Sequence, residues 1–171
     1  TLTIGHSGVF GLDSGVSSSI YFDGYNGYGI DITNSVALNR SINFRTRGAL
    51  VTIDGVVSGA AANLLNKQEQ GTLWLNGNNT YAGDTNISYG YLVLGNDNAL
   101  GTATSAVLFR AGNSFSQLLL SGAGRTLSRN ITNSATAGTQ TLGGLGAEST
   151  SFTGNITLTR GVSLSAAAGG D

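Results

Sequence analysis

The chain has 171 residues, of which 27 are glycine and only 10% are charged, and its formal net charge is −1. Eight scattered lysine and arginine residues do not form the basic cluster that nucleic-acid binding requires, so that class of function is excluded. The absence of cysteine excludes disulfide bonds, thiolate metal sites and cysteine nucleophiles, whereas a hydrophobic content of 40% suffices for a core.

Short runs of alternating apolar residues predict strands of about five residues along the whole chain. Clusters of Gly, Asn, Ser and Thr separate these runs and disfavour helix. Each run places two apolar side chains on one strand face, and in chain order the pairs are Leu2/Ile4, Ile20/Phe22, Ile30/Ile32, Val51/Ile53, Leu73/Leu75, Leu92/Leu94, Val107/Phe109, Leu118/Leu120, Ile156/Leu158 and Val162/Leu164. The segment from Gly59 to Gln70 comes nearest to a helical pattern, and there we expect a short helix or a loop.

The first half of the chain recurs in the second half, which indicates an internal duplication. The matched segments, in order, are residues 1–11 with 91–101, 18–22 with 105–109, 30–32 with 118–120, and 38–42 with 127–131. Their separations of 90, 87, 88 and 89 positions predict a first unit at residues 1–90 and a second, truncated unit at residues 91–171. Both units would belong to one continuous solenoid.

Many short strands without intervening helices predict an all-β fold, and the repetition favours a parallel β-helix. In such a fold each coil stacks on the previous one, so that similar side chains form ladders inside, and Asn and Gly occupy the corners. An antiparallel sandwich or barrel stays open as an alternative, because its hairpins favour Asn-Gly and Asp-Gly turns. Four such pairs occur, at Asp23-Gly24, Asn26-Gly27, Asp54-Gly55 and Asn76-Gly77.

Residues 71–101 read GTLWLNGNNTYAGDTNISYGYLVLGNDNALG and carry an ordered motif of about thirty residues. Its positions are Gly71, Thr72, Leu73, Leu75, Gly77, Asn79, Thr80, Tyr81, Gly83, Thr85, Gly90, Leu92, Gly95, Ala99, Leu100 and Gly101. This stretch resembles the autotransporter-associated β-strand repeat, or passenger-associated transport repeat, of bacterial autotransporter passenger domains. Asp84 and Tyr91 depart from the family pattern, which has Gly and Thr there, and we expect both to face outward.

The resemblance implies a right-handed parallel β-helix that is exported across the outer membrane or displayed on the cell surface. It also implies that the repeat assists passenger folding and secretion and carries out no chemistry. We interpret the motif as a corner of a coil, with Leu73 and Leu75 in the core, Asn79 bracing the turn and Tyr81 covering the stack. Turn chemistry accounts for every residue type in the motif, so this interpretation is favoured over a ligand site.

Other candidate sites are weak in the sequence. His6 is the only histidine and has no neighbouring acid or second histidine for a metal site or triad. The nine acids are dispersed, at Asp13, Asp23, Asp31, Asp54, Glu69, Asp84, Asp97, Glu148 and Asp171. Asp31 and Asp54 could stack on successive coils as a carboxylate pair, yet the second unit has Leu119 in place of Asp31. We therefore predict no catalytic, cofactor-binding or metal-binding residue and no enzyme.

The function predicted from these observations is a structural segment of a large secreted or surface-displayed bacterial protein, such as an adhesin stalk or an extracellular fibre. Two alternatives stay open, a polysaccharide-acting β-helix enzyme and a carbohydrate-binding or ice-binding module. Regular Thr-x-Thr faces would support the ice-binding module, but Thr-Leu-Thr occurs only at residues 1–3 and 157–159, and Thr-Gln-Thr at residues 139–141.

The expected partners are neighbouring coils of the same or identical chains and a host or surface glycan or other cell-surface ligand. No nucleic acid and no membrane insertion are expected, since no run approaches the roughly 20 apolar residues of a membrane helix. Residues 1–11 and 156–166 begin and end on interior-type strands, so we expect them to expose core surface and to stack end to end against another coil.

Overall fold

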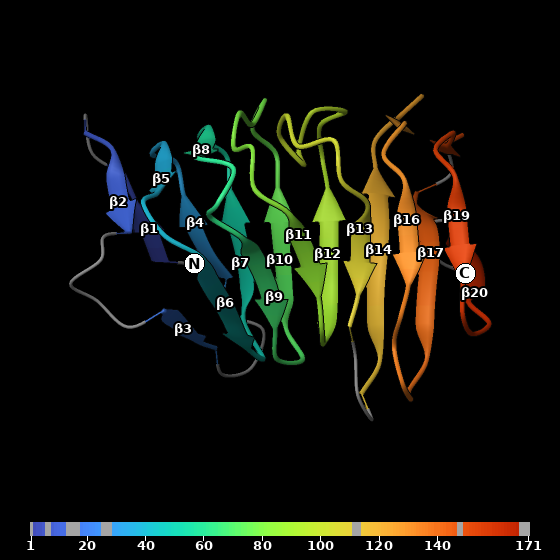
Figure 1. The fold of residues 1–171 in the computed structure, drawn as a ribbon. Helices are drawn as coiled ribbons and strands as arrows, with labels where there is room; N and C mark the ends of the chain where they lie inside the picture. Colours follow the sequence, from blue (N-terminus) through green and yellow to red (C-terminus); the bar gives the residue numbers. More distant parts are fainter. Residues whose placement is uncertain are drawn as a thin grey trace.

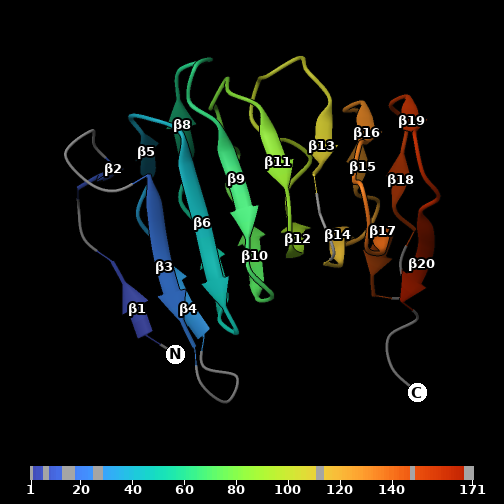
Figure 2. The same ribbon diagram turned by 60° about the horizontal axis from the view of Figure 1, so that its bottom comes forward.

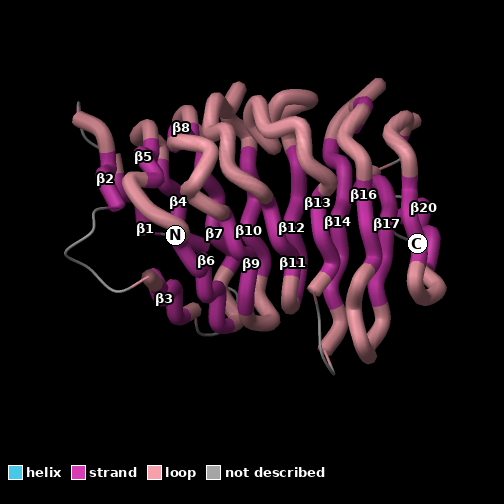
Figure 3. Tube along the Cα trace, in the orientation of Figure 1, coloured by secondary structure: helices cyan, strands magenta, loops and turns pink. Residues whose placement is uncertain are grey.

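The chain winds into a stack of coils whose strands lie side by side along one axis (Figure 1). The structure, a computed structural model, describes residues 2–5, 8–12, 18–24, 29–110, 114–146 and 149–167. Those residues form twenty strands and no helix, as the tube in Figure 3 also shows. Each pairing between these strands is parallel, which confirms the all-β parallel β-solenoid and excludes the antiparallel sandwich.

Two long sheets form the main sides of the solenoid. The eight-stranded sheet contains, in spatial order, β1 (Leu2–Ile4), β4 (Gly29–Ile32), β7 (Leu50–Ile53), β10 (Thr72–Leu75), β12 (Gly90–Leu94), β14 (Ser116–Ser121), β17 (Gln140–Leu145) and β20 (Ser163–Ala167). The seven-stranded sheet, turned toward the reader in Figure 2, contains β3 (Ser19–Asp23), β6 (Ile42–Arg47), β9 (Leu65–Gln68), β11 (Thr85–Ile87), β13 (Val107–Phe109), β16 (Ile131–Asn133) and β19 (Ile156–Leu158).

Shorter strands occupy the segments that connect the two long sheets. One group comprises β2 (Phe10–Leu12), β5 (Val36–Leu38) and β8 (Val57–Gly59), and the other comprises β15 (Thr126–Leu127) and β18 (Ser151–Phe152). Between the groups, backbone bonds continue the stacking without named strands: Thr80 N donates to Val57 O at 2.8 Å, and Thr102 N donates to Tyr81 O at 2.9 Å. The stack is therefore held together by backbone bonds on this side as well.

The register of the eight-stranded sheet defines the length of each coil. Successive inward partners run from Leu2 through Ile30, Val51, Leu73, Leu92, Leu118 and Leu142 to Leu164. The shortest step, from Leu73 to Leu92, is 19 positions, and the longest, from Leu2 to Ile30, is 28. Leu2 and Leu92 are four coils apart, so the offset of 90 positions in the sequence spans four coils. The division into units 1–90 and 91–171 stays a prediction.

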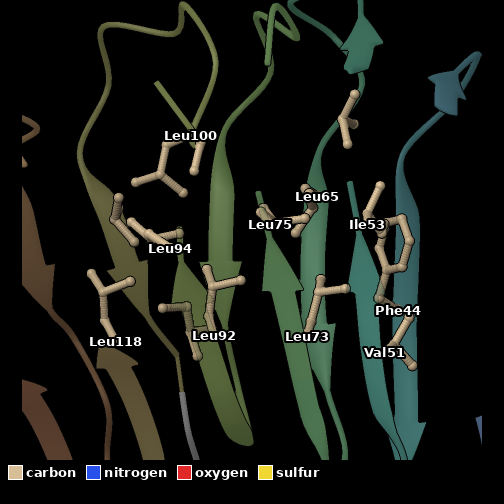
Figure 4. Close-up of a cluster of buried hydrophobic side chains, with 14 of the residues drawn as sticks. Phe44, Val51, Ile53, Leu65, Leu73, Leu75, Leu92, Leu94, Leu100 and Leu118 are labelled. Atoms are coloured by element: carbon tan, nitrogen blue, oxygen red, sulfur yellow. The ribbon is translucent and has the colours of Figure 1, made fainter. Parts of the chain in front are cut away.

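The core lies inside the coils and consists mainly of stacked Leu, Ile, Val and Phe side chains. Leu73, Leu92 and Leu118 lie in one inward row, and Leu75 and Leu94 lie in the next, with at most 1% of each side chain exposed. Figure 4 shows part of this stack. Each side chain packs between its counterparts in the coils before and after it, and its burial contributes roughly 1.5–3 kcal/mol to the hydrophobic stabilisation.

A ladder of side-chain amides runs along the outer face of the seven-stranded sheet. Asn86 Nδ2 donates to Asn66 Oδ1 at 2.7 Å, and Asn66 Nδ2 donates to Asn43 Oδ1 at 3.0 Å. The three residues are register partners on β6, β9 and β11. Parallel stacking without a register shift makes this ladder possible, because it places identical amides one above the other.

The expectation of a short helix or loop from Gly59 to Gln70 is wrong over its second half, where β9 spans Leu65–Gln68. The segment pairs with β6 on one side and β11 on the other, and Leu65 and Lys67 point inward in alternation. Pairing on both sides overrides the helical preference of this stretch, which includes Lys and Gln.

Both ends of the described stack show apolar side chains at the surface. Leu2 is 61% exposed and Leu164 is 80% exposed, whereas Ile4 and Val162 are partly buried against the core. Ile156 and Leu158 on β19 are also exposed. Within the described residues, no segment covers these side chains. Stacking of another coil against them stays a prediction.

We expect the substitution of an inward leucine to cost much more stability than the substitution of an outward one. Leu75→Ala should lower the free energy of unfolding by about 2–5 kcal/mol, because it opens a cavity between adjacent coils. Leu50→Ala, at a side chain that is 39% exposed on the neighbouring strand, should cost less than about 1 kcal/mol. Urea denaturation followed by circular dichroism measures both, and equal losses would contradict the described register.

Candidate functional site

The motif at residues 71–101 occupies β10, the corner that follows it, β11, β12 and the turn beyond β12. Its leucines, Leu73, Leu75, Leu92 and Leu100, lie in the core. Its glycines lie where a methyl group would come within 3 Å of another atom of the protein, and these are Gly71, Gly77, Gly83, Gly90, Gly95 and Gly101. The corner is therefore packed backbone against backbone.

Two of these glycines also have a left-handed backbone conformation. Gly90 has φ +78° and Gly101 has φ +67°. A methyl group at Gly90 would lie 2.3 Å from the carbonyl oxygen of Glu69, and one at Gly101 would lie 2.1 Å from that of Tyr81. Any other residue at either position would thus meet both backbone strain and a steric clash with the preceding coil.

Asn79 joins the coils on either side of its own. Its Oδ1 accepts a hydrogen bond from Val57 N at 2.7 Å, and its Nδ2 donates to Ala99 O at 2.6 Å. The side chain is 2% exposed, and Val57 and Ala99 are fully buried. One amide thus satisfies a buried donor and a buried acceptor that face each other across three coils.

Tyr81 lies inside the core, not on top of the stack. The interpretation that it covers the stack is wrong, since its side chain is completely buried. Its hydroxyl and Thr85 Oγ1 are 2.8 Å apart and form a hydrogen bond. Burial raises the pKa of Tyr81 to about 12, an effect that the bond to Thr85 and the charge of Arg129 reduce.

Lys67 is a functional candidate that the sequence reasoning missed. Its side chain is fully buried in the inward row between Phe44 and Ile87. Its Nζ donates to the carbonyl oxygens of Gln68 at 3.0 Å, Glu69 at 2.7 Å and Tyr89 at 2.8 Å. These bonds tie the end of β9 and the turn after it to the turn after β11.

The backbone of Glu69 supports this arrangement. Among the described residues, Glu69 is the only one other than glycine with a positive φ, at 68°. The left-handed conformation accompanies the short bond from Lys67, while the Glu69 carboxylate pairs with Arg45 at 3.2 Å. Burial lowers the pKa of Lys67 from 10.5 to about 7, and the Glu69 carboxylate partly offsets this effect. The signal available in the sequence was the alternation of Lys67 with Leu65, which places the lysine on the inward face.

The acids among the described residues do not gather into a site. Asp31 pairs in register with Thr52, and Asp54 Oδ1 accepts a bond from Asn76 Nδ2 at 2.8 Å, so the two carboxylates do not stack on each other. Asp84, expected to face outward, is half-buried and bonded to Ser105 Oγ. Tyr91 faces outward and is half-buried. His6, Asp13, Glu148 and Asp171 lie outside the described residues.

The part of the chain that the structure describes shows neither a metal-site grouping nor a membrane helix. No three His, Cys, Asp or Glu side chains come together there in a way that could hold a metal ion. The same residues contain no helix long and apolar enough to cross a membrane.

Residues 65–94 match the model of the Passenger-associated-transport-repeat family. This match confirms the resemblance seen in residues 71–101. The matched stretch begins with β9 and ends with β12, so it contains both Lys67 and Asn79. Comparison with curated proteins gave no match, and neither did comparison with solved structures.

The Asn79 brace predicts a specific loss of stability. Asn79→Ala should lower the free energy of unfolding by about 1–3 kcal/mol, because Val57 N and Ala99 O would stay buried without partners. The adjacent Asn78 is exposed, so Asn78→Ala should change it by less than about 0.5 kcal/mol. Similar effects of the two variants in urea denaturation would refute the bracing role.

The lowered pKa of Lys67 predicts that the free energy of unfolding rises with pH above 7. Between pH 7 and pH 10.5 the unfolded chain keeps a proton on Lys67 that the folded chain releases. Raising the pH in this window therefore favours folding, by up to about 1.4 kcal/mol per pH unit. Urea denaturation from pH 7.5 to pH 9.5 should show this increase in the original protein, and Lys67→Met should lose it. An unchanged slope in the variant would contradict the assignment.

Tyr81 has the opposite effect on stability at higher pH, where the free energy of unfolding falls as the pH rises. Its folded pKa of about 12 lies above its ordinary value of 10.0, so the unfolded chain loses the phenol proton first. The contribution of Tyr81 is therefore complete below pH 10 and is lost as the pH rises toward 12. This window lies above the one proposed for measuring Lys67, so the two effects are separable.

Proposed function

We propose that the chain is a structural segment of a large secreted or surface-displayed bacterial protein, in which residues 65–101 set the register of the coils as the solenoid folds. The observation that supports this most directly is the coincidence of the family match at residues 65–94 with the corner where Asn79 joins three coils. An adhesin stalk or an extracellular fibre is the setting that best suits such a segment.

The physical need for such an element follows from the solenoid. Each coil contacts mainly its neighbours, and a parallel stack has no hairpins to fix which residue pairs with which. Coils of 19 to 28 residues also vary in length, so the backbone alone does not set the alignment. Buried polar groups that find partners only in one register supply the missing specificity, and Lys67 and Asn79 are groups of this kind.

Export is supported by the family match and agrees with the composition. The family is described by its association with the transport of passenger domains. The chain carries no cysteine and little charge, and its stability rests on contacts that form only when coils stack. A chain of this kind can cross an envelope unfolded and then fold coil by coil on the far side, with the register-setting corner as the template.

Folding kinetics test this proposal. If residues 65–101 form the template, Asn79→Ala should slow refolding in proportion to its loss of stability. Leu142→Ala removes a buried side chain on β17, outside the motif, and should mainly speed unfolding. Stopped-flow refolding and unfolding in urea measure both variants. If Asn79→Ala changes only the unfolding rate, the proposed role in folding is wrong even if the stability prediction holds.

A further inference from the structure

A groove crosses the outer face of the eight-stranded sheet, at positions that the structural role leaves unused. Its volume is about 240 Å³. The floor consists of Val93 and Leu119, which are 2% and 6% exposed although they point outward. The walls are Leu50, Thr72, Trp74, Tyr91 and Leu145. The groove thus runs along the solenoid axis from β7 to β17, across five neighbouring strands.

The aromatic rings of the groove lean along the sheet. A methyl group at Gly95 would lie 3.0 Å from Trp74 Nε1, so the indole reaches over the next coil where glycine leaves space. The Tyr91 ring lies 5.2 Å from the Phe115 ring, which belongs to the coil after it. Trp74 and Tyr91 are both half-buried, so part of each aromatic side chain stays open to solvent beside the groove.

The groove carries no charge. The outward positions of its strands are all uncharged, and they are Leu50, Thr52, Thr72, Trp74, Tyr91, Val93, Gln117, Leu119, Ser121, Thr141, Gly143 and Leu145. An occupant that placed a charge there would lose its hydration without gaining a partner. The occupant that complements this face is therefore neutral where it touches the groove.

The size of the face argues against a second protein. Five strands spaced by about 4.8 Å, each about five residues long, cover roughly 300 Å². A stable protein interface buries about 800 Å² on each partner. The face therefore suits a narrow, extended ligand better than a second copy of this chain.

We propose that this groove binds a neutral oligosaccharide. The apolar C–H face of a pyranose ring would stack on Trp74 and Tyr91, and its hydroxyl groups would reach Thr72 and Gln117 beside the rings. The spacing of the coils, about 4.8 Å, is comparable with the length of one pyranose ring in an extended chain, so successive sugars would meet successive coils. This binding site does not depend on the proposed folding role.

The experiment uses the chain's own reporter, because Trp74 is its only tryptophan. The 171-residue protein is titrated separately with cellohexaose, maltohexaose and N-acetylchitohexaose while the tryptophan emission is recorded. A hexamer of galacturonic acid serves as the charged probe. We expect a saturable change in emission with at least one neutral hexasaccharide and none with the charged one.

Variants separate the groove from the rest of the surface. Isothermal titration calorimetry should show that Tyr91→Ala weakens binding by about 5-fold, while Tyr91→Phe, which keeps the ring, stays within about 2-fold of the original protein. Tyr21→Ala removes an outward aromatic ring from the seven-stranded sheet and should leave binding unchanged. Circular dichroism confirms that each variant is folded.

Three results would overturn the proposal. The first is the absence of any emission change with all three neutral hexasaccharides. The second is equal binding of the charged hexamer, which would indicate that the groove's neutrality does not select its ligand. The third is a dimer in sedimentation velocity that Tyr91→Ala dissociates, which would assign the face to a second copy of the chain.

Discussion

The structure depends on stacking each coil on the next without a shift in register. In a strand, a slip of one residue would turn the inward side chains outward, so the row from Leu73 through Leu92 to Leu118 exists only in one alignment. Backbone bonds alone do not choose this alignment, since every register offers the same donors and acceptors. The choice therefore falls to side chains, and the buried polar ones penalise a wrong register most, because they would lose their partners.

Lys67 and Asn79 use this principle in different ways. Asn79 bonds one donor and one acceptor in the two adjacent coils, so a shift of either coil would leave a buried group unpaired. Lys67 gathers three carbonyl groups from two turns, and its burial depresses its pKa. The lysine thus fixes the turns at one end of the strands, while the asparagine fixes the corner at the other. Both residues lie within the stretch that matches the repeat family.

The sequence predicted the parts of this fold that alternate, and it missed the parts that depend on neighbours. Leu73 and Leu75 were recognisable because both are apolar and two positions apart. Strand β9 was not, because its second inward residue is a lysine. The burial of Lys67 depends on carbonyl acceptors that its own turn and the turn of the next coil provide only in the folded chain. The core position of Tyr81 was missed for a similar reason, since its hydroxyl finds Thr85 only after the corner has folded.

The same register leaves the two outer faces free to differ. On the seven-stranded sheet it aligns Asn43, Asn66 and Asn86 into an amide ladder, which ends where Leu108 follows Asn86 and leaves Asn86 Oδ1 without a partner. On the eight-stranded sheet it aligns Trp74 with Val93 and Leu119 into an apolar groove. Both faces depend on the alignment that the core also requires, the asparagine ladder through its own hydrogen bonds from coil to coil. A solenoid that serves as a structural segment can also carry a binding surface, because inward and outward side chains alternate and respond to separate physical demands.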